Sequence, residues 1–213
     1  MPAGGQGRGA QALPAARRHR DAGDRAARDA DHAHRRAAVR RHGARGQAVV
    51  TGQQGALVRL RAVQRRLEEH AAAGLPPGLT DPDPGGTERW EAGQVWAHLA
   101  EFPWYWLGQI RDILGRQASG EPEPIAFGRT KTDPGRIAAI ERDRHGDPAA
   151  LLKRVTDGIA ATVEQLDALP ADAWGARGLH PTRGIMRPAE ILERFIVAHL
   201  EEHADQLDQL RAG

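Results

Sequence analysis

Two histidines near the C-terminus have a spacing suited to metal binding. His199 and His203 are four residues apart in a segment of helical periodicity. On an α-helix this separation places them about 40° apart around the axis and about 6 Å along it, so both rings lie on one face. That face is apolar, and an imidazole nitrogen buried there needs a partner. The pair either shares one metal ion or consists of two core histidines, and its spacing leaves both interpretations open.

A third candidate ligand, His98, lies on the apolar face of another predicted helix, between Val95 and Phe102. Three histidines from two helices would leave one coordination position open, which is typical of catalytic metal sites rather than closed structural ones. The other histidines of the body are weaker candidates, because they fall among charges or in connections: His70, His145 and His180.

A peptidase motif overlaps the histidine pair. The run His199-Leu200-Glu201-Glu202-His203 fits the H-x-x-E-H pattern, in which Glu202 would be the catalytic base. Peptidases of this type take a third ligand from well downstream. Only ten residues follow His203, so the third ligand must come from upstream and the peptidase interpretation fails.

A diiron carboxylate bundle is a further alternative. Such bundles use Glu-x-x-His on two helices and one glutamate from each of the others. Here the order is reversed, because Glu101 follows His98 by three residues. The extra carboxylates would have to be Glu69 and Glu164, which both stand beside polar residues. The order of the motif therefore disfavours this alternative.

Four amphipathic helices are predicted to position these residues. Apolar residues recur every three or four positions in four segments, which is the period of a helix with one buried face. The predicted segments are 57–71, 91–115, 147–169 and 188–210. The stripe of the second segment includes Leu114, and Pro103 predicts a kink one turn after His98. Because no segment alternates with period two over a useful length, no sheet is expected, and the fold class is an all-α four-helix bundle.

Two connections separate these helices. Residues 117–146 contain several prolines and a possible short helix at 135–144, and so long a connection is typical of a segment that covers a site. Residues 171–186 form the second connection. Four arginines in or beside the connections are candidates for holding substrate carboxylates, although each could equally be a solvated surface charge: Arg129, Arg136, Arg183 and Arg187.

Composition divides the chain into an N-terminal leader, residues 1–48, and a body, residues 50–213. The first 46 residues contain 11 arginines and four aspartates, whereas the rest contains 19 basic and 24 acidic residues. All nine aromatic residues lie at Trp90 or later. The leader has too few large apolar residues to offset the entropy of ordering it, so we expect it to be disordered. Its arginines could bind nucleic acid, but we expect no nucleic-acid binding by the folded body.

The leader could also result from a start codon assigned too far upstream. Its Ala/Arg/Gly/Asp bias indicates a GC-rich gene, and the native protein would then begin near Val49 or Val50. The chain has no cysteine, which excludes disulfides, a thiolate nucleophile and cysteine-based metal sites. It shows neither a secretory signal nor an apolar run long enough to span a membrane, so a cytoplasmic location is expected.

Two motifs of the body resemble those of the DinB-like family. The first runs from Trp90 through His98 to Glu101 (WEAGQVWAHLAE), and the second from Ala198 to Leu207 (AHLEEHADQL). Their order and separation also match, and the resemblance covers about 50–213. The chain departs from the family pattern at Pro103 and at Glu91, where a small capping residue is more usual.

The resemblance implies a four-helix fold related to mycothiol-dependent maleylpyruvate isomerases and bacillithiol S-transferases. It implies a divalent metal, with zinc or nickel favoured and iron possible, held by His98, His199 and His203, and a homodimer. The implied activity is thiol S-transfer to a small molecule with an added thiol such as mycothiol, because an ion on three neutral imidazoles would lower the pKa of a thiol or water. Metal-dependent hydrolysis and a non-catalytic binding bundle are the alternatives. Glu202 is the candidate catalytic group, and Glu202 or Glu101 could orient a ligand.

Overall fold

The first helix of the body covers residues 54–72, and its apolar stripe is buried, as the period of three and four residues predicts. Leu60, Val63 and Leu67 from this stripe are almost fully inaccessible to solvent. The structure is a computed structural model that describes residues 54–82, 87–170 and 172–213. The predicted leader lies outside these residues.

Helix α2, Ala92–Ala118, is the longest described helix and contains most of the first motif, including His98. Its first turn is capped because the side-chain oxygen of Gln94 accepts a hydrogen bond from the backbone N–H of Glu91 at 3.1 Å. The helix continues through Pro103, which is buried. Its predicted stripe needs one correction: Ile113, not Leu114, is the buried residue near its C-terminal end, because the helix turns Leu114 partly toward solvent.

The next two helices both begin at an Asp-Pro pair. Helix α3, Pro134–Asp143, begins after Asp133, whose carboxylate accepts from the backbone N–H of Arg136. Helix α4, Pro148–Ala168, begins in the same way after Asp147. An aspartate cap followed by proline at the first helical position is favourable, because proline has no N–H to leave unpaired there. The short 3-10 helix η2, Ala173–Gly175, follows α4.

The last predicted helix consists of three consecutive parts. Helix α5, Pro188–Leu192, continues into the π-helical turn η3, Glu193–Val197, and then into α6, Ala198–Ala212. A π-helical turn inserts one residue into the helical repeat and is frequent at functional sites. The π-helical turn ends two residues before His199, and it sets the direction in which His199 and His203 point from α6.

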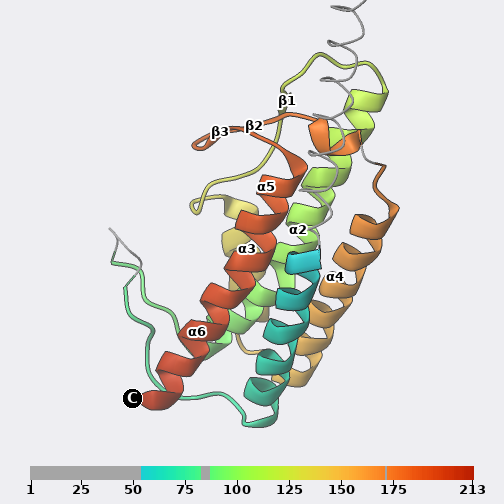
Figure 1. Cartoon of the computed structure of the whole chain (residues 1–213). Helices are drawn as coiled ribbons and strands as arrows, with labels where there is room; N and C mark the ends of the chain where they lie inside the picture. The colour runs from blue at the N-terminus through green and yellow to red at the C-terminus, as the bar shows by residue number, and fades with distance from the viewer. Residues whose placement is uncertain (1–53, 83–86, 171) are drawn as a thin grey trace, which may run out of the picture. The chain divides into compact units, whose positions relative to one another are not determined.

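A small sheet corrects the expectation that the chain has no strands. Strand β1, Ile125–Ala126, pairs in parallel with β2, Gly178–His180, and β2 pairs antiparallel with β3, Gly184–Met186. Each strand has only two or three residues, too few for a period-two pattern to be visible in the sequence. The sheet joins the two long connections at one end of the bundle (Figure 1).

Helix α2 lies at the centre of the arrangement and packs against α3, α4, α5 and α6 (Figure 1). The helix of residues 54–72 is joined to α6 by ion pairs, among them Arg59–Glu201 and Arg66–Asp205. The prediction of an all-α four-helix bundle is thereby confirmed, with α3 as an additional short helix. Among the described helices, none combines the length and the apolar character needed to cross a membrane.

Candidate metal centre

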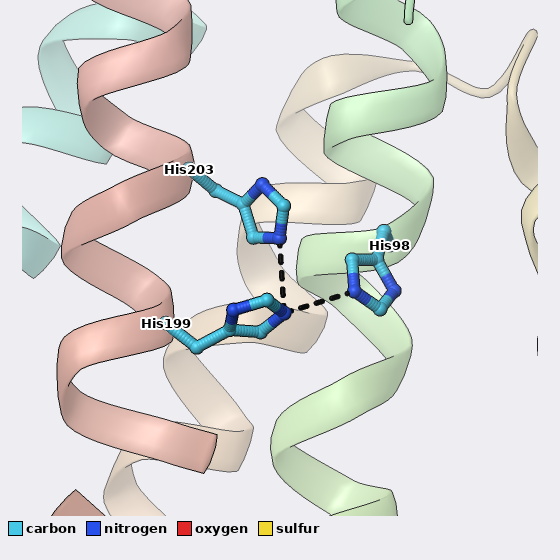
Figure 2. Close-up of side chains that lie close together, drawn as sticks. All are labelled: His98, His199 and His203. Carbon is cyan, nitrogen blue, oxygen red and sulfur yellow. Dashed lines mark hydrogen bonds between the residues drawn. The ribbon is translucent and has the colours of Figure 1, made fainter. Parts of the chain in front are cut away.

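The structure brings the three predicted histidines together from two helices (Figure 2). His98 extends from α2, whereas His199 and His203 extend from successive turns of α6. The Nε2 atom of His199 lies 3.2 Å from Nε2 of His98 and 3.1 Å from Nε2 of His203. His98 and His203 are buried, but the side chain of His199 is 28% exposed. The cluster therefore opens to solvent on the His199 side.

The other ring nitrogen of each histidine contacts a side-chain oxygen three residues further along the same helix. The Nδ1-to-oxygen distances are 2.8 Å for His98–Glu101, 3.0 Å for His199–Glu202 and 2.7 Å for His203–Gln206. Carboxylate and amide oxygens accept hydrogen bonds and do not donate them. Each imidazole therefore donates from Nδ1, and in its neutral state it keeps the lone pair of its Nε2 atom free.

When all three rings are neutral, the three Nε2 lone pairs face one another with no proton between them. Acceptors buried without a donor are costly, and a cation among them would satisfy all three. For Zn–N distances of 2.0–2.1 Å, two ligands of a tetrahedral ion lie about 3.3 Å apart. The observed separations of 3.1 and 3.2 Å are close to this value. The donor set and its geometry thus fit a divalent ion such as zinc.

Burial keeps two of the three rings neutral. Loss of solvent lowers the pKa of His98 well below 6.5, and a proton on the neighbouring His203 or His199 would lower it further. Burial also lowers the pKa of His203 to about 3, with a smaller contribution from His199. Both rings are therefore unprotonated at neutral pH, which is the state that metal ligation requires.

Two aromatic side chains enclose the histidines. The ring of Trp90 stacks nearly parallel to that of His203, with centroids 5.8 Å apart, and meets His98 edge-on at 5.3 Å. The ring of Phe102 packs edge-on against His199 at 4.7 Å. Trp90 is itself held by Thr80, whose hydroxyl accepts from the Trp90 backbone N–H. These contacts restrict the rotation of the imidazoles and keep water from the buried side of the cluster.

The two predicted carboxylates differ in their surroundings. Glu101 is nearly buried, with 9% of its side chain exposed, whereas the side chain of Glu202 is 59% exposed. The hydrogen bond from His199 lowers the pKa of Glu202, so this group is ionised at neutral pH. Because Glu202 contacts Nδ1, on the far side of the ring from the Nε2 atoms, this contact suits an orienting role. Its catalytic role stays a prediction.

The sequence-based reasoning did not identify Gln206. This residue follows His203 at the same interval that separates Glu101 from His98 and Glu202 from His199. The interval is readable from the sequence, because residues three apart are neighbours on one helix face. The repeated spacing was therefore a signal that could have identified all three histidine partners.

The candidate arginines have separate environments. Arg129 forms an ion pair with Glu101, and its guanidinium lies 3.8 Å from the centroid of the Tyr105 ring. Arg136 lies over Trp90 at 5.1 Å and donates to the backbone oxygen of Lys131. The other two, Arg183 and Arg187, lie in the β2–β3 turn and immediately before α5. The long connection thus brings Arg129 and Arg136 to the histidine cluster.

The other histidines do not join this cluster. His70 is buried between α6 side chains, where Nδ1 accepts from Arg211 and Nε2 contacts Asp208. His145 is exposed, and His180 is buried in β2 against the rings of Phe195, Trp106 and Phe127. The carboxylates that a diiron site would need also lie elsewhere: Glu69 and Glu164 are both exposed. Within the described part of the chain, the three-histidine group is the one that could hold a metal ion.

An open cavity of about 670 Å³ lies between the helix of residues 54–72 and α4. Its lining includes Leu60, Ile159 and Val163, together with the acidic Glu164 and Asp167. No histidine of the cluster contributes to it. We therefore place the candidate site at the histidines, where the polar groups converge, and not at this cavity.

Several solved structures share the fold. YfiT from Bacillus subtilis, described as a probable metal-dependent hydrolase with an unusual four-helix bundle topology, is 20% identical, with a TM-score of 0.57 over 75% of this chain and 86% of that chain. The mycothiol-dependent maleylpyruvate isomerase is 16% identical, with a TM-score of 0.50 over 73% of this chain. This chain spans 60% of that isomerase.

A third structure is that of the colibactin self-resistance protein ClbS in complex with double-stranded DNA. It is 13% identical, with a TM-score of 0.49 over 75% of this chain and 94% of that chain. The expectation that the folded body binds no nucleic acid stays a prediction.

A search of curated proteins found no match. The model of the DinB superfamily matches residues 59–207, which include all three histidines and their contact residues. These residues make up most of the chain and nearly all of its described part. The protein therefore belongs to the DinB superfamily.

Proposed function

We propose that this protein is a metal-dependent enzyme that acts on a small molecule, with one divalent ion held by His98, His199 and His203. The observation that carries this proposal is the convergence of three Nε2 atoms whose Nδ1 partners are all acceptors. Hydrogen-bonded core histidines would pair donors with acceptors. Here the acceptors face one another, so the arrangement favours a cation.

The protein residues would confine the reaction to one side of the site. A divalent ion held there would supply positive charge and an open coordination position, which lower the pKa of a thiol or of water. Three neutral imidazoles would leave that charge uncompensated. Trp90 and Phe102 close the buried side, and the partly exposed His199 marks the side by which a small molecule would enter.

We propose thiol S-transfer as the reaction. The thiol sulfur supplies the electron pair of a new carbon–sulfur bond, the leaving group departs with the electron pair of the broken bond, and the thiol proton goes to solvent. The chain has no cysteine, so the thiol must be a separate molecule such as mycothiol. The mycothiol dependence of the structurally similar isomerase supports this choice. Arg136, at the edge of the site over Trp90, is our candidate for holding a carboxylate of the electrophile.

Hydrolysis is the second candidate function, with water in place of the thiol. The description of YfiT as a probable metal-dependent hydrolase favours it, as does the ionised and exposed carboxylate of Glu202 beside the open side of the cluster. A binding bundle without turnover is the non-catalytic alternative. A cytoplasmic location and a homodimer remain predictions from the sequence.

An activity screen of zinc-loaded protein separates these functions. A chlorodinitrobenzene electrophile and an activated ester are each supplied with and without a panel of thiols that includes mycothiol. S-transfer predicts turnover that requires added thiol and is lost in His199→Ala. Turnover of the ester without thiol would instead support hydrolysis. Metal-loaded protein that turns over neither would contradict the enzymatic proposal and favour the binding bundle.

A further inference from the structure

The Glu101 carboxylate is held from two sides. One oxygen accepts from Nδ1 of His98 at 2.8 Å, and one terminal nitrogen of Arg129 contacts both oxygens, at 2.5 and 2.7 Å. The side chains of Glu101 and Arg129 are each 9% exposed. Charge-assisted hydrogen bonds at such distances fix the orientation of a carboxylate. Glu101 therefore has little freedom to turn away from His98.

Arg129 is itself fixed by its surroundings. Its guanidinium packs over the Tyr105 ring at 3.8 Å, a favourable cation–π contact. Just before it, the backbone N–H of Phe127 donates to the carbonyl of Leu179 in β2 at 3.1 Å, and that of Gly128 donates to the Gln109 side chain at 2.6 Å. The small sheet and α2 together determine where Arg129 enters the site.

The backbone at Gly128 admits no larger residue. Its φ is +86°, a left-handed conformation that favours glycine, and a Cβ atom there would lie 2.5 Å from the His180 ring. His180 in turn is buried among aromatic rings. Gly128 therefore lies against the fixed ring of His180, and this contact determines the backbone position just before Arg129.

We infer that Arg129 is a positioning residue, which holds Glu101 against His98 so that the Nε2 lone pair of His98 points to the centre of the cluster. This inference rests on the proposed function. It gives a role to the long connection of residues 117–146. This connection supplies Arg129, whereas the histidines lie on α2 and α6. His199 has no equally enclosed support, because its partner Glu202 is mostly exposed.

The direction in which metal affinity changes when Arg129 is removed distinguishes a positioning role from a purely electrostatic effect of its charge. A positive charge near the cluster repels a divalent cation, so removing Arg129 would tighten metal binding if its charge alone mattered. If Arg129 positions His98 through Glu101, its removal would weaken metal binding. Loss of such an outer-shell partner typically costs 10–100-fold in metal affinity. The two roles thus predict opposite changes.

The test measures zinc affinity by competition with a chromogenic chelator. We expect Arg129→Met, which keeps much of the packing on Tyr105, to weaken zinc binding about tenfold or more. Arg111→Met is the matched control, because Arg111 is exposed on α2 and bonds only Gln165 among the hydrogen bonds described. Parental or tighter zinc binding by Arg129→Met would overturn the inference.

Arg129→Lys covers the case in which the methionine variant does not fold. It keeps a positive charge beside Glu101 but is shorter and lacks the planar guanidinium. We expect Arg129→Lys to weaken zinc binding as well, and parental affinity in this variant would overturn the inference.

A second readout needs no metal. Long-range 1H–15N NMR of the metal-free protein reports which nitrogen of the His98 ring carries the proton, with His98→Ala used for assignment. We expect the Nδ1 proton in the parent and a mixture of tautomers in the Arg129 variants. If the parent binds no zinc, the proposed function fails, and this measurement still decides the role of Arg129: an unchanged tautomer in the variants overturns it, and a mixture supports it.

Discussion

At the scale of single residues, the site consists of three histidine–acceptor pairs. In each pair the acceptor follows the histidine by three residues on the same helix, so secondary structure alone brings the two side chains together. The acceptors receive hydrogen bonds from Nδ1 and so favour the tautomer whose Nε2 atom can bind a metal. Gln206 is the neutral member of the set, and it supports His203, whose ring stacks on Trp90.

We predict that Gln206→Leu weakens zinc binding by about tenfold, because His203 would lose the acceptor that fixes its tautomer. Gln206→Glu keeps an acceptor at the same position and should retain affinity close to that of the parent. Gln209→Leu, on the exposed face of α6, is the matched control. Chelator competition measures all three variants, and equal affinities for Gln206→Leu and the parent would contradict the assigned role.

At the scale of elements, α2 must come very close to the end of α3. A Cβ atom at Gly93 would lie 2.1 Å from the backbone oxygen of Arg144, which caps α3. An ion pair between Glu91 and Arg144 joins the same two ends. This approach places α3, and with it Arg136, beside Trp90. Glycine is therefore needed at position 93 because the two helices pack so closely there, and not because the helix itself needs it.

We predict that Gly93→Ala destabilises the fold by about 1–3 kcal/mol, the usual cost of overpacking. Helix propensity alone predicts the opposite, a gain of up to about 1 kcal/mol. Gly108→Ala on the same helix is the control, because a Cβ atom there meets nothing within 4 Å. Urea unfolding would show a loss for the first variant and a small gain for the second. A gain in both variants would contradict the close approach.

The contact between α3 and α4 predicts a pH dependence of stability. Hydrogen bonds from Arg142, and then from Arg154 of α4, lower the pKa of Asp143 from 3.8 to about 2. A lowered folded-state pKa contributes stability above the unfolded value of 3.8, and this contribution is lost as the pH falls toward 2. Because the arginines are largely exposed, the contribution is about 1 kcal/mol or less.

Asp143→Asn should therefore lower the free energy of unfolding at about pH 5 to 7, and its difference from the parent should shrink as the pH falls below about 4. Urea unfolding at several pH values measures this difference, with Asp157→Asn as a surface control on α4. A difference that stays constant down to about pH 2.5 would contradict the assignment to Asp143.

At the scale of the whole molecule, the helices and the ligand set could be predicted because their signals are local. Periodicity of three and four residues gives helices, and Asp-Pro pairs mark the starts of α3 and α4. The spacing of His199 and His203 on one helix face indicates a shared site. The addition of His98 rests on its apolar helix face, and the resemblance of its motif to that of the DinB-like family supports it.

The remaining features depend on contacts between distant segments. Strands of two or three residues have no detectable pattern, and the pairing of β1 with β2 joins segments more than 50 residues apart, such as Ile125 with Gly178. The π-helical turn η3 shifts the helical register by a single residue. The spacing of apolar residues in the sequence is too irregular to reveal so small a shift. The link from Arg129 to Glu101 depends on how the long connection folds, which the composition of that segment does not specify.

The metal content of the purified protein tests the central claim most directly. The chain is purified without a chelating column, and bound metal is quantified by mass spectrometry in the parent, His98→Ala and His199→Ala, with folding checked by circular dichroism. Three-histidine ligation predicts about one divalent ion per chain in the parent and loss of that ion in both folded variants. A parent that holds no metal and cannot be reloaded with zinc, or a folded variant that retains the ion, would contradict the account.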